Sequence, residues 1–139
     1  MSLLMSDAMA RLMGELRHEP IRKRIRARSG DRVVVDTTEA LLVYEPRRVS
    51  PMYAVPESAV RAALVSRGPV TPGGPGFLHP GIPFAVHSTD GESLSVDVDG
   101  RVHEDAAFRP ADPDLAGYVV LDFDAFDWLE EDEPIHGHP

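Results

Sequence analysis

The chain has 139 residues, of which 42% are hydrophobic, so it is long and apolar enough to fold as one domain with a core of its own. It has no cysteine, which excludes disulfide scaffolds and thiolate zinc sites, and no apolar run approaches the ~20 residues of a membrane span. Its formal net charge of -9 argues against general binding to phosphate backbones.

The N-terminal segment predicts a short helix. Apolar residues recur with helical spacing from Leu4 to Leu16, and Pro20 ends the pattern. The segment lacks the basic start followed by an apolar stretch that marks a signal peptide. We therefore expect residues 1–20 to form a helical extension and the protein to be cytoplasmic.

From Ile21 onward the pattern changes to that of short strands. One face of the first strand would carry Ile21, Lys23, Ile25 and Ala27, and the other Arg22, Arg24, Arg26 and Arg28. Ser29-Gly30-Asp31 then supplies a turn. The β-branched run Val33 to Val35 and the apolar run Leu41 to Tyr44 predict two further strands. Because the links between them are short, we expect the three strands to form an antiparallel meander.

A basic stripe lies in this first strand region. Its members are Arg22, Lys23, Arg24, Arg26, Arg28 and Arg32. A platform for single-stranded nucleic acid would carry aromatic residues between these charges, and none occurs between Ile21 and Val43. We therefore interpret the stripe as the solvated face of a strand hairpin and expect no nucleic-acid partner.

The middle of the chain is irregular. Met52 to Val55 predicts a brief strand, and Pro56 opens a helical turn. Residues 66–83 contain five prolines and five glycines, which predicts a long mobile loop.

The second half predicts another set of strands. Phe84 to His87 begins it, and the dipeptides Asp90-Gly91 and Asp99-Gly100 are both hairpin signals. Tyr118 to Phe123 predicts a more deeply buried strand. We expect about eight strands in a single β domain over residues 21–129, followed by an acidic flexible tail over residues 130–139.

The stretch "LDFDAFDWLEEDE" gathers the carboxylates that could do chemistry. Asp122 and Asp124 would face the same way in a strand, so they could jointly hold Mg²⁺. The alternative, which we favour, is that Asp124 caps a helix over Ala125 to Glu130, with Asp127 at its third position. In that case no metal is bound.

The other side chains that could carry chemistry show no catalytic or metal-binding spacing. The six histidines do not pair as zinc ligands, and His136-x-His138 has no third ligand nearby. The nucleophile motif G-x-S-x-G and the phosphate-binding motifs are absent. We therefore expect no cofactor, with Mg²⁺ at the paired aspartates as the alternative.

Two segments together resemble the family called domain of unknown function 427. They are "VVVDTTEALLVYEPRRVSPMYAVPESAVRAALV", residues 33–65, and "VHEDAAFRPADPDLAGYVVLDFDAFDWLEEDE", residues 102–133. The resemblance implies a β-tent-like domain, in which two small antiparallel sheets lean together at one edge. It also implies a concave surface between the sheets that suits a small ligand. The chain looks like the first copy of a tandem arrangement.

The resemblance brings a nucleotidyltransferase label that the residues support only in part. Such chemistry needs a Gly-Ser step at a helix start, and this chain has no Gly-Ser dipeptide. Many family members have Cys-Pro-Tyr-Lys-Gly before the second set of strands. Here the region reads "HPGIPFAVHSTDGE", which keeps only the proline and an aromatic, Pro83-Phe84.

We therefore expect a mainly β, non-enzymatic module that binds a small ligand or a second copy of the fold. The alternative is a Mg²⁺-dependent nucleotidyltransferase that uses Asp122 and Asp124. The matching segments suggest Glu45, Tyr53 and Phe84 as pocket residues. Polar groups that could orient a ligand are Arg48, His87 and Arg109. We assign Tyr118 and Trp128 to the core, and a dimer through a shared sheet edge is a third possibility.

Overall fold

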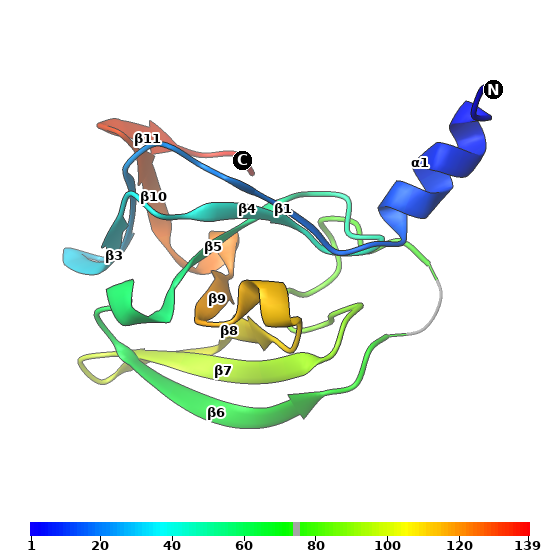
Figure 1. The fold of residues 1–139 in the computed structure, drawn as a ribbon. Coiled ribbons are helices and arrows are strands. Elements are labelled where there is room, and N and C mark those ends of the chain that lie inside the picture. Colours follow the sequence, from blue (N-terminus) through cyan, green and yellow to red (C-terminus); the bar gives the residue numbers. More distant parts are fainter. Residues whose placement is uncertain (74–75) are drawn as a thin grey trace.

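The computed structural model describes residues 1–73 and 76–139, and these form one N-terminal helix and two antiparallel sheets (Figure 1). The strands are β1 (Arg17–Pro20), β2 (Ile25–Ser29), β3 (Arg32–Thr37), β4 (Leu41–Tyr44), β5 (Met52–Pro56), β6 (Ala63–Val70), β7 (Gly91–Val98), β8 (Arg101–Pro110), β9 (Tyr118–Leu121), β10 (Asp127–Glu130) and β11 (Glu133–Ile135). The helix is α1 (Met5–Met13), and the 3₁₀ turns are η1 (Glu57–Ala59), η2 (Pro113–Leu115) and η3 (Phe123–Ala125). The predicted fold class, mainly β with an N-terminal helix and short helical turns, is confirmed.

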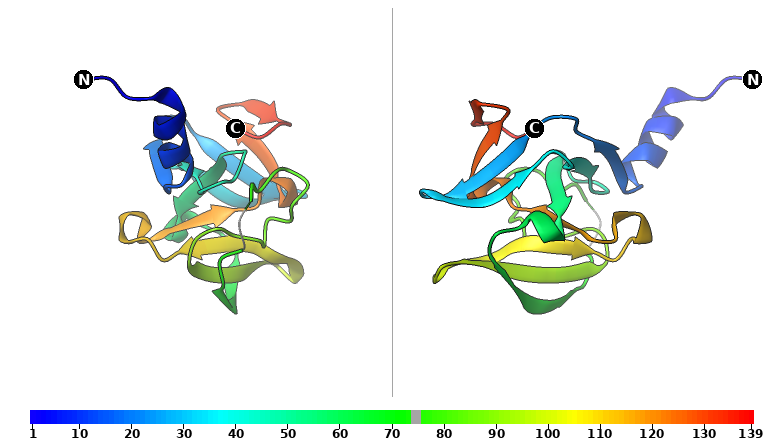
Figure 2. Two further views of the ribbon diagram at one scale, coloured as in Figure 1. Left: turned by 90° about the vertical axis from the view of Figure 1, so that its right-hand side faces the viewer. Right: turned by 60° about the vertical axis from the view of Figure 1, so that its left-hand side comes forward.

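The larger sheet has the strand order β1-β4-β5-β9-β8-β7-β6, and the smaller one has the order β11-β10-β2-β3. All neighbours are antiparallel. Strand β9 lies between β5 and β8, so the last third of the chain returns to the centre of the larger sheet. Figure 2 shows the two sheets from two further sides, with α1 extending away from both.

A shared apolar core joins the two sheets. Ile25 and Ala27 of β2 are fully buried, because alternate side chains of a strand face the same side. Tyr53 of the larger sheet packs against Trp128 of the smaller one, with ring centroids 4.8 Å apart. The indole Nε1 of Trp128 donates a hydrogen bond of 2.9 Å to the carbonyl oxygen of Phe123. The assignment of Trp128 to the core is therefore confirmed.

The hairpin predicted at Asp99-Gly100 is present between β7 and β8. Both residues have positive φ, 51° and 93°, as the type I′ turn requires. The Gly100 N–H also donates to the Asp97 carboxylate over 2.7 Å. Asp90-Gly91, by contrast, is not a hairpin turn, because Gly91 is the first residue of β7 and pairs with Pro110. A Cβ atom at Gly91 would lie 2.5 Å from the carbonyl oxygen of Arg109, so glycine is required there by close approach.

The predicted three-strand meander is wrong in one respect. Strands β2 and β3 do form a hairpin, but β4 pairs with β1 and β5 in the other sheet. The short link between Thr37 and Leu41 carries the chain from one sheet to the other, and alternation within a strand does not report such a change.

The strand predicted at Phe84 to His87 is also wrong. These residues form a turn, and the second set of strands begins at Gly91. Side chains take the hydrogen bonds that a neighbouring strand would supply. Arg48 donates to the Val86 carbonyl oxygen, and Glu45 accepts from the Ser88 N–H.

The cap predicted at Asp124 lies two residues earlier in the structure. Asp122 is the capping residue, and its Oδ1 accepts the Asp124 N–H over 3.1 Å at the start of η3. The expected helix from Ala125 to Glu130 is absent, because Phe126 and Trp128 are buried while Asp127 is exposed. That period of two is the pattern of a strand, and this segment forms β10.

The acidic segment after Glu130 contains β11, which pairs with β10, whereas the sequence predicts a loosely ordered tail. Basic side chains relieve the repulsion within the acidic run. Lys23 pairs with Glu130, and Arg26 pairs with Asp132 over 2.9 Å. The limits proposed for the domain and its extensions stay predictions.

The predicted long loop over residues 66–83 begins later than expected, since β6 continues to Val70 and pairs with β7. Residues 74–75 of that prediction lie outside the described residues. Among the helices described, none has the length and apolar character needed to cross a membrane.

Candidate functional site

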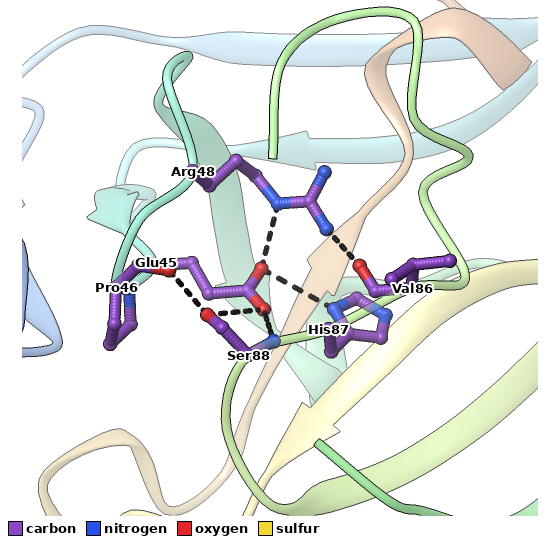
Figure 3. Close-up of polar contacts among 6 residues, drawn as sticks. All are labelled: Glu45, Pro46, Arg48, Val86, His87 and Ser88. Carbon is purple, nitrogen blue, oxygen red and sulfur yellow. Dashed lines mark hydrogen bonds and ion pairs between the residues drawn. The ribbon is translucent and has the colours of Figure 1, made fainter. Parts of the chain in front are cut away.

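The carboxylate of Glu45 is buried and lies at the centre of a polar cluster. Glu45 follows the last residue of β4 and is 2% exposed. Its Oε2 accepts a hydrogen bond from Arg48 Nε over 2.8 Å and lies 3.3 Å from His87 Nδ1. Its Oε1 accepts from the N–H and the hydroxyl of Ser88. We call Glu45, Arg48, His87 and Ser88 the Glu45 cluster (Figure 3).

The cluster keeps Glu45 ionised. Burial alone would raise the pKa of this carboxyl group, but several contacts lower it. The hydrogen bond and charge of His87 are the largest of these, followed by the charge of Arg48 and the backbone N–H of Ser88. The net result is a pKa lowered to about 2. Glu45 is therefore a fixed negative charge that ties the loop before β7 to the segment after β4.

The carboxylate of Glu45 holds Arg48 in place, and one guanidinium nitrogen of Arg48 remains available as a donor. It is 9% exposed, its Nε donates to Glu45, and its Nη2 donates to the carbonyl oxygen of Val86. Nη1 has no hydrogen-bond partner among the described residues, and Figure 3 shows it pointing away from both Glu45 and Val86. The guanidinium carbon also lies 6.0 Å from the centre of the Phe84 ring.

Arg48 lines a pocket of about 310 Å³, which we call the Arg48 pocket. Its walls come from the loop before β7, the segment around η3, the residues after Arg48, and one residue near the C-terminus. The remaining lining residues are Ser50, Met52, Leu78, His79, Pro80, Gly81, Ile82, Pro83, Phe84, Asp122, Phe123, Asp124 and His138. The pocket therefore combines an apolar lining with a few polar groups, as small-molecule sites do.

Two carboxylates lie in this pocket. Burial raises the pKa of Asp122, against the hydrogen bond from the Asp124 N–H and the more distant charges of His138 and Arg48. The side chain of Asp124 is 77% exposed, and its Oδ1 lies 4.0 Å from His138 Nε2. Within the residues that the structure describes, no group of three or more His, Cys, Asp or Glu side chains could hold a metal ion.

The comparison with protein families assigns part of the chain. Residues 17–72 match the family described as a domain of unknown function (DUF427). The predicted resemblance is thereby confirmed for the first of its two segments. The match runs from β1 to beyond β6 and includes Glu45 and Arg48. No curated protein matches the chain.

The DUF427 match covers only one side of the Arg48 pocket. The other walls, with Phe84 and Asp122, come from residues beyond it. The resemblance of residues 102–133 to this family stays a prediction. So does the resemblance of the chain to the first copy of a tandem arrangement.

The structure brings together four of the six predicted pocket residues. Glu45, Arg48 and His87 meet in the Glu45 cluster, and Phe84 packs edge-on against His87 with ring centroids 5.0 Å apart. Of these four, Arg48 and Phe84 reach the pocket itself. His87 is 1% exposed, and its ring centroid lies 3.8 Å from that of Phe108. It therefore packs behind Phe84, outside the pocket lining.

The other two predicted pocket residues lie elsewhere. Tyr53 is a core residue beside Trp128, with its hydroxyl 3.4 Å from Glu130. Arg109 forms ion pairs with Glu57 and Glu92 and lines no part of the Arg48 pocket.

Sequence reasoning missed the contribution of Ser88, because a backbone N–H and a lone hydroxyl give no pattern. It named Asp122 and Asp124 only as the alternative metal ligands. Both aspartates reach the pocket because they lie at the turn η3. Their spacing of two residues is the sequence feature that places them close together.

The basic stripe of the smaller sheet is largely neutralised. Arg24 pairs with Asp36 over 2.7 Å, and Arg32 lies 3.3 Å from Asp99. Together with the pairs of Lys23 and Arg26, these contacts turn the stripe into a mixed-charge surface.

Proposed function

We propose that the protein binds a small organic molecule in the Arg48 pocket, with Nη1 of Arg48 donating a hydrogen bond to an oxygen of that molecule. The observation that carries the proposal is a buried arginine with a spare donor that lines a pocket. Unlike buried atoms without a partner such as His87 Nε2, this nitrogen is accessible, so a ligand or water in the pocket is its expected partner.

The Glu45 cluster supports this proposal because it fixes the donor before any ligand arrives. Two of the three guanidinium nitrogens are bound to Glu45 and Val86, so the plane of the guanidinium cannot rotate freely. A donor that is already oriented loses little conformational entropy on binding, and this favours affinity.

The lining supports a ligand with an apolar body. Phe84 and Phe123 supply aromatic surface, and Met52 and Ile82 supply aliphatic surface. A volume of about 310 Å³ falls at the lower end of the range for small-molecule sites. We propose a binding role for this pocket, and we assign His87 a structural one, because it is 1% exposed and does not line the pocket.

The test is a binding screen by ¹H–¹⁵N NMR with small aromatic and aliphatic amides, carboxylates and amines. Binders should shift the backbone amides of Ile82, Phe84 and Asp124. Arg48→Lys keeps the charge beside Glu45 but loses the planar fork, so it should weaken binding by about tenfold. The matched variant Arg109→Lys makes the same change outside the pocket and should bind as the wild type does.

A second variant keeps the proposal testable if Arg48→Lys destabilises the protein. Ile82→Trp narrows the pocket without touching the Glu45 cluster, and it should abolish binding in a protein that is otherwise folded. The proposal is wrong if the shifts map outside the pocket, or if both pocket variants bind as tightly as Arg109→Lys.

A further inference from the structure

The Arg48 pocket carries charges of both signs that are not paired with each other. Arg48 supplies a guanidinium, and Asp122 and Asp124 supply carboxylates. In the part of the chain that the structure describes, no ion pair within 4.0 Å joins Arg48 to either aspartate. Burial raises the pKa of Asp122 on balance, but the charge of Arg48 acts in the opposite direction, so the groups share one electrostatic environment. A ligand could contact both without displacing an internal ion pair.

The positive and negative side chains that line this pocket do not cancel each other's charge. The guanidinium of Arg48 is already neutralised by Glu45, whose Oε2 lies 2.8 Å from its Nε. Among the described residues, His138 is the one basic group within 4.0 Å of the Asp124 carboxylate, and the 4.0 Å between Asp124 Oδ1 and His138 Nε2 exceeds a hydrogen-bond length. The uncompensated charge in the pocket is therefore negative, and the chain as a whole carries a net charge of -9. Both features favour a cation over an anion.

We infer that the ligand is a small organic amine that also carries an oxygen acceptor. The ammonium group lies by Asp122 and Asp124, the oxygen accepts from Nη1 of Arg48, and an apolar body contacts Phe84 and Phe123. Amino-acid amides and free amino acids with apolar side chains are the simplest members of this class. The inference rests on the proposed function and specifies the chemistry of its ligand.

Four probes with the same phenyl ring separate the two contacts. L-Phenylalaninamide has both the ammonium and the carbonyl oxygen, phenethylamine has only the ammonium, 3-phenylpropanamide has only the carbonyl oxygen, and 3-phenylpropanoate has an anion instead. NMR titration at pH 7 gives a Kd for each. L-Phenylalaninamide should bind tightest, and loss of either contact should raise the Kd by about tenfold, as expected for one hydrogen bond to a charged group. The 3-phenylpropanoate anion should bind weakest.

Variants of the carboxylates give the second half of the test. Asp124→Asn changes an exposed side chain, and Asp122→Asn keeps an acceptor at the cap of η3, so both should fold. Each should raise the Kd of L-phenylalaninamide and phenethylamine by about tenfold and leave that of 3-phenylpropanamide unchanged. Asp127→Asn removes an exposed carboxylate outside the pocket and should change none of them.

The outcomes separate this inference from the proposed function. If 3-phenylpropanoate or 3-phenylpropanamide binds in the pocket as tightly as L-phenylalaninamide, the pocket is a ligand site but the amine assignment is wrong. The same conclusion follows if Asp122→Asn and Asp124→Asn leave amine binding unchanged. If no probe of any charge shifts the pocket signals, the proposed function fails together with the inference.

Discussion

Two arginines that the sequence suggests as ligand-orienting groups have different surroundings in the folded chain. Arg48 and Arg109 both contact glutamates. Arg109 uses all three nitrogens on carboxylates. Its Nε donates to Glu57 over 3.1 Å, Nη2 contacts the same residue, and Nη1 contacts Glu92. Arg48 lines a pocket, and its Nη1 has no hydrogen-bond partner in residues 1–73 and 76–139.

Burial is the second difference between the two clusters. The side chain of Arg109 is 38% exposed, and that of Glu57 is 36% exposed. The Arg48 and Glu45 side chains are 8% and 2% exposed. Exposed ion pairs contribute little to stability, whereas removing one partner of a buried pair leaves a charge without water or a counter-ion. Burial and an available donor therefore separate Arg48, for which we propose ligand binding, from Arg109 in its exposed ion pairs.

The largest expected effect is on stability, and it compares the same substitution in both clusters. Glu45→Gln should lower the free energy of unfolding by about 3–5 kcal/mol, because Arg48 loses its buried counter-ion. Glu57→Gln should cost about 0.2–1 kcal/mol, since water screens the Arg109 pair. Urea denaturation at pH 7, followed by Trp128 fluorescence, measures both. Equal losses in the two variants would contradict the distinction drawn from burial.

The second prediction concerns pH and is somewhat smaller. The folded-state pKa of Glu45 is about 2, below the ordinary value of 4.5. The stabilisation from its ionised form is therefore complete above the ordinary pKa and is lost as the pH falls through that of the folded state. This contribution amounts to roughly 3 kcal/mol, and about half of it should be gone by pH 3.

The measurement for this second prediction is the stability difference between wild type and Glu45→Gln at a series of pH values from 7 to 3. The difference should narrow as the pH falls. A difference that stays constant down to pH 3 would show that folding does not lower the pKa of Glu45.

The comparison also shows which parts of the fold and the site a sequence can predict. Alternation of apolar residues predicts β2 and the turn at Asp99-Gly100, because both depend on local spacing. It does not predict that β4 lies in the larger sheet and β3 in the smaller one, because both strands have the same local pattern.

The site follows the same rule. The family resemblance suggests Glu45, and the sequence offers Arg48 and His87 as polar groups that could orient a ligand. Their partners are the Val86 carbonyl and the Ser88 N–H, and backbone groups look alike at every position of a sequence. The same reasoning suggests Arg109, but its distance from the pocket depends on the long-range pairing of β8 with β7 and β9.

The smallest expected effect is a response to salt, and it distinguishes the two clusters without any ligand. At about 0.5 M NaCl, the stability difference between wild type and Glu57→Gln should fall to the limit of detection, because salt screens charges that face water. The difference for Glu45→Gln should persist, since ions cannot approach a carboxylate that is 2% exposed. Urea midpoints of the three proteins at low and high salt provide the measurement. If salt reduced both differences in the same proportion, the Glu45 cluster would be open to solvent, and the oriented donor proposed for Arg48 would lose its support.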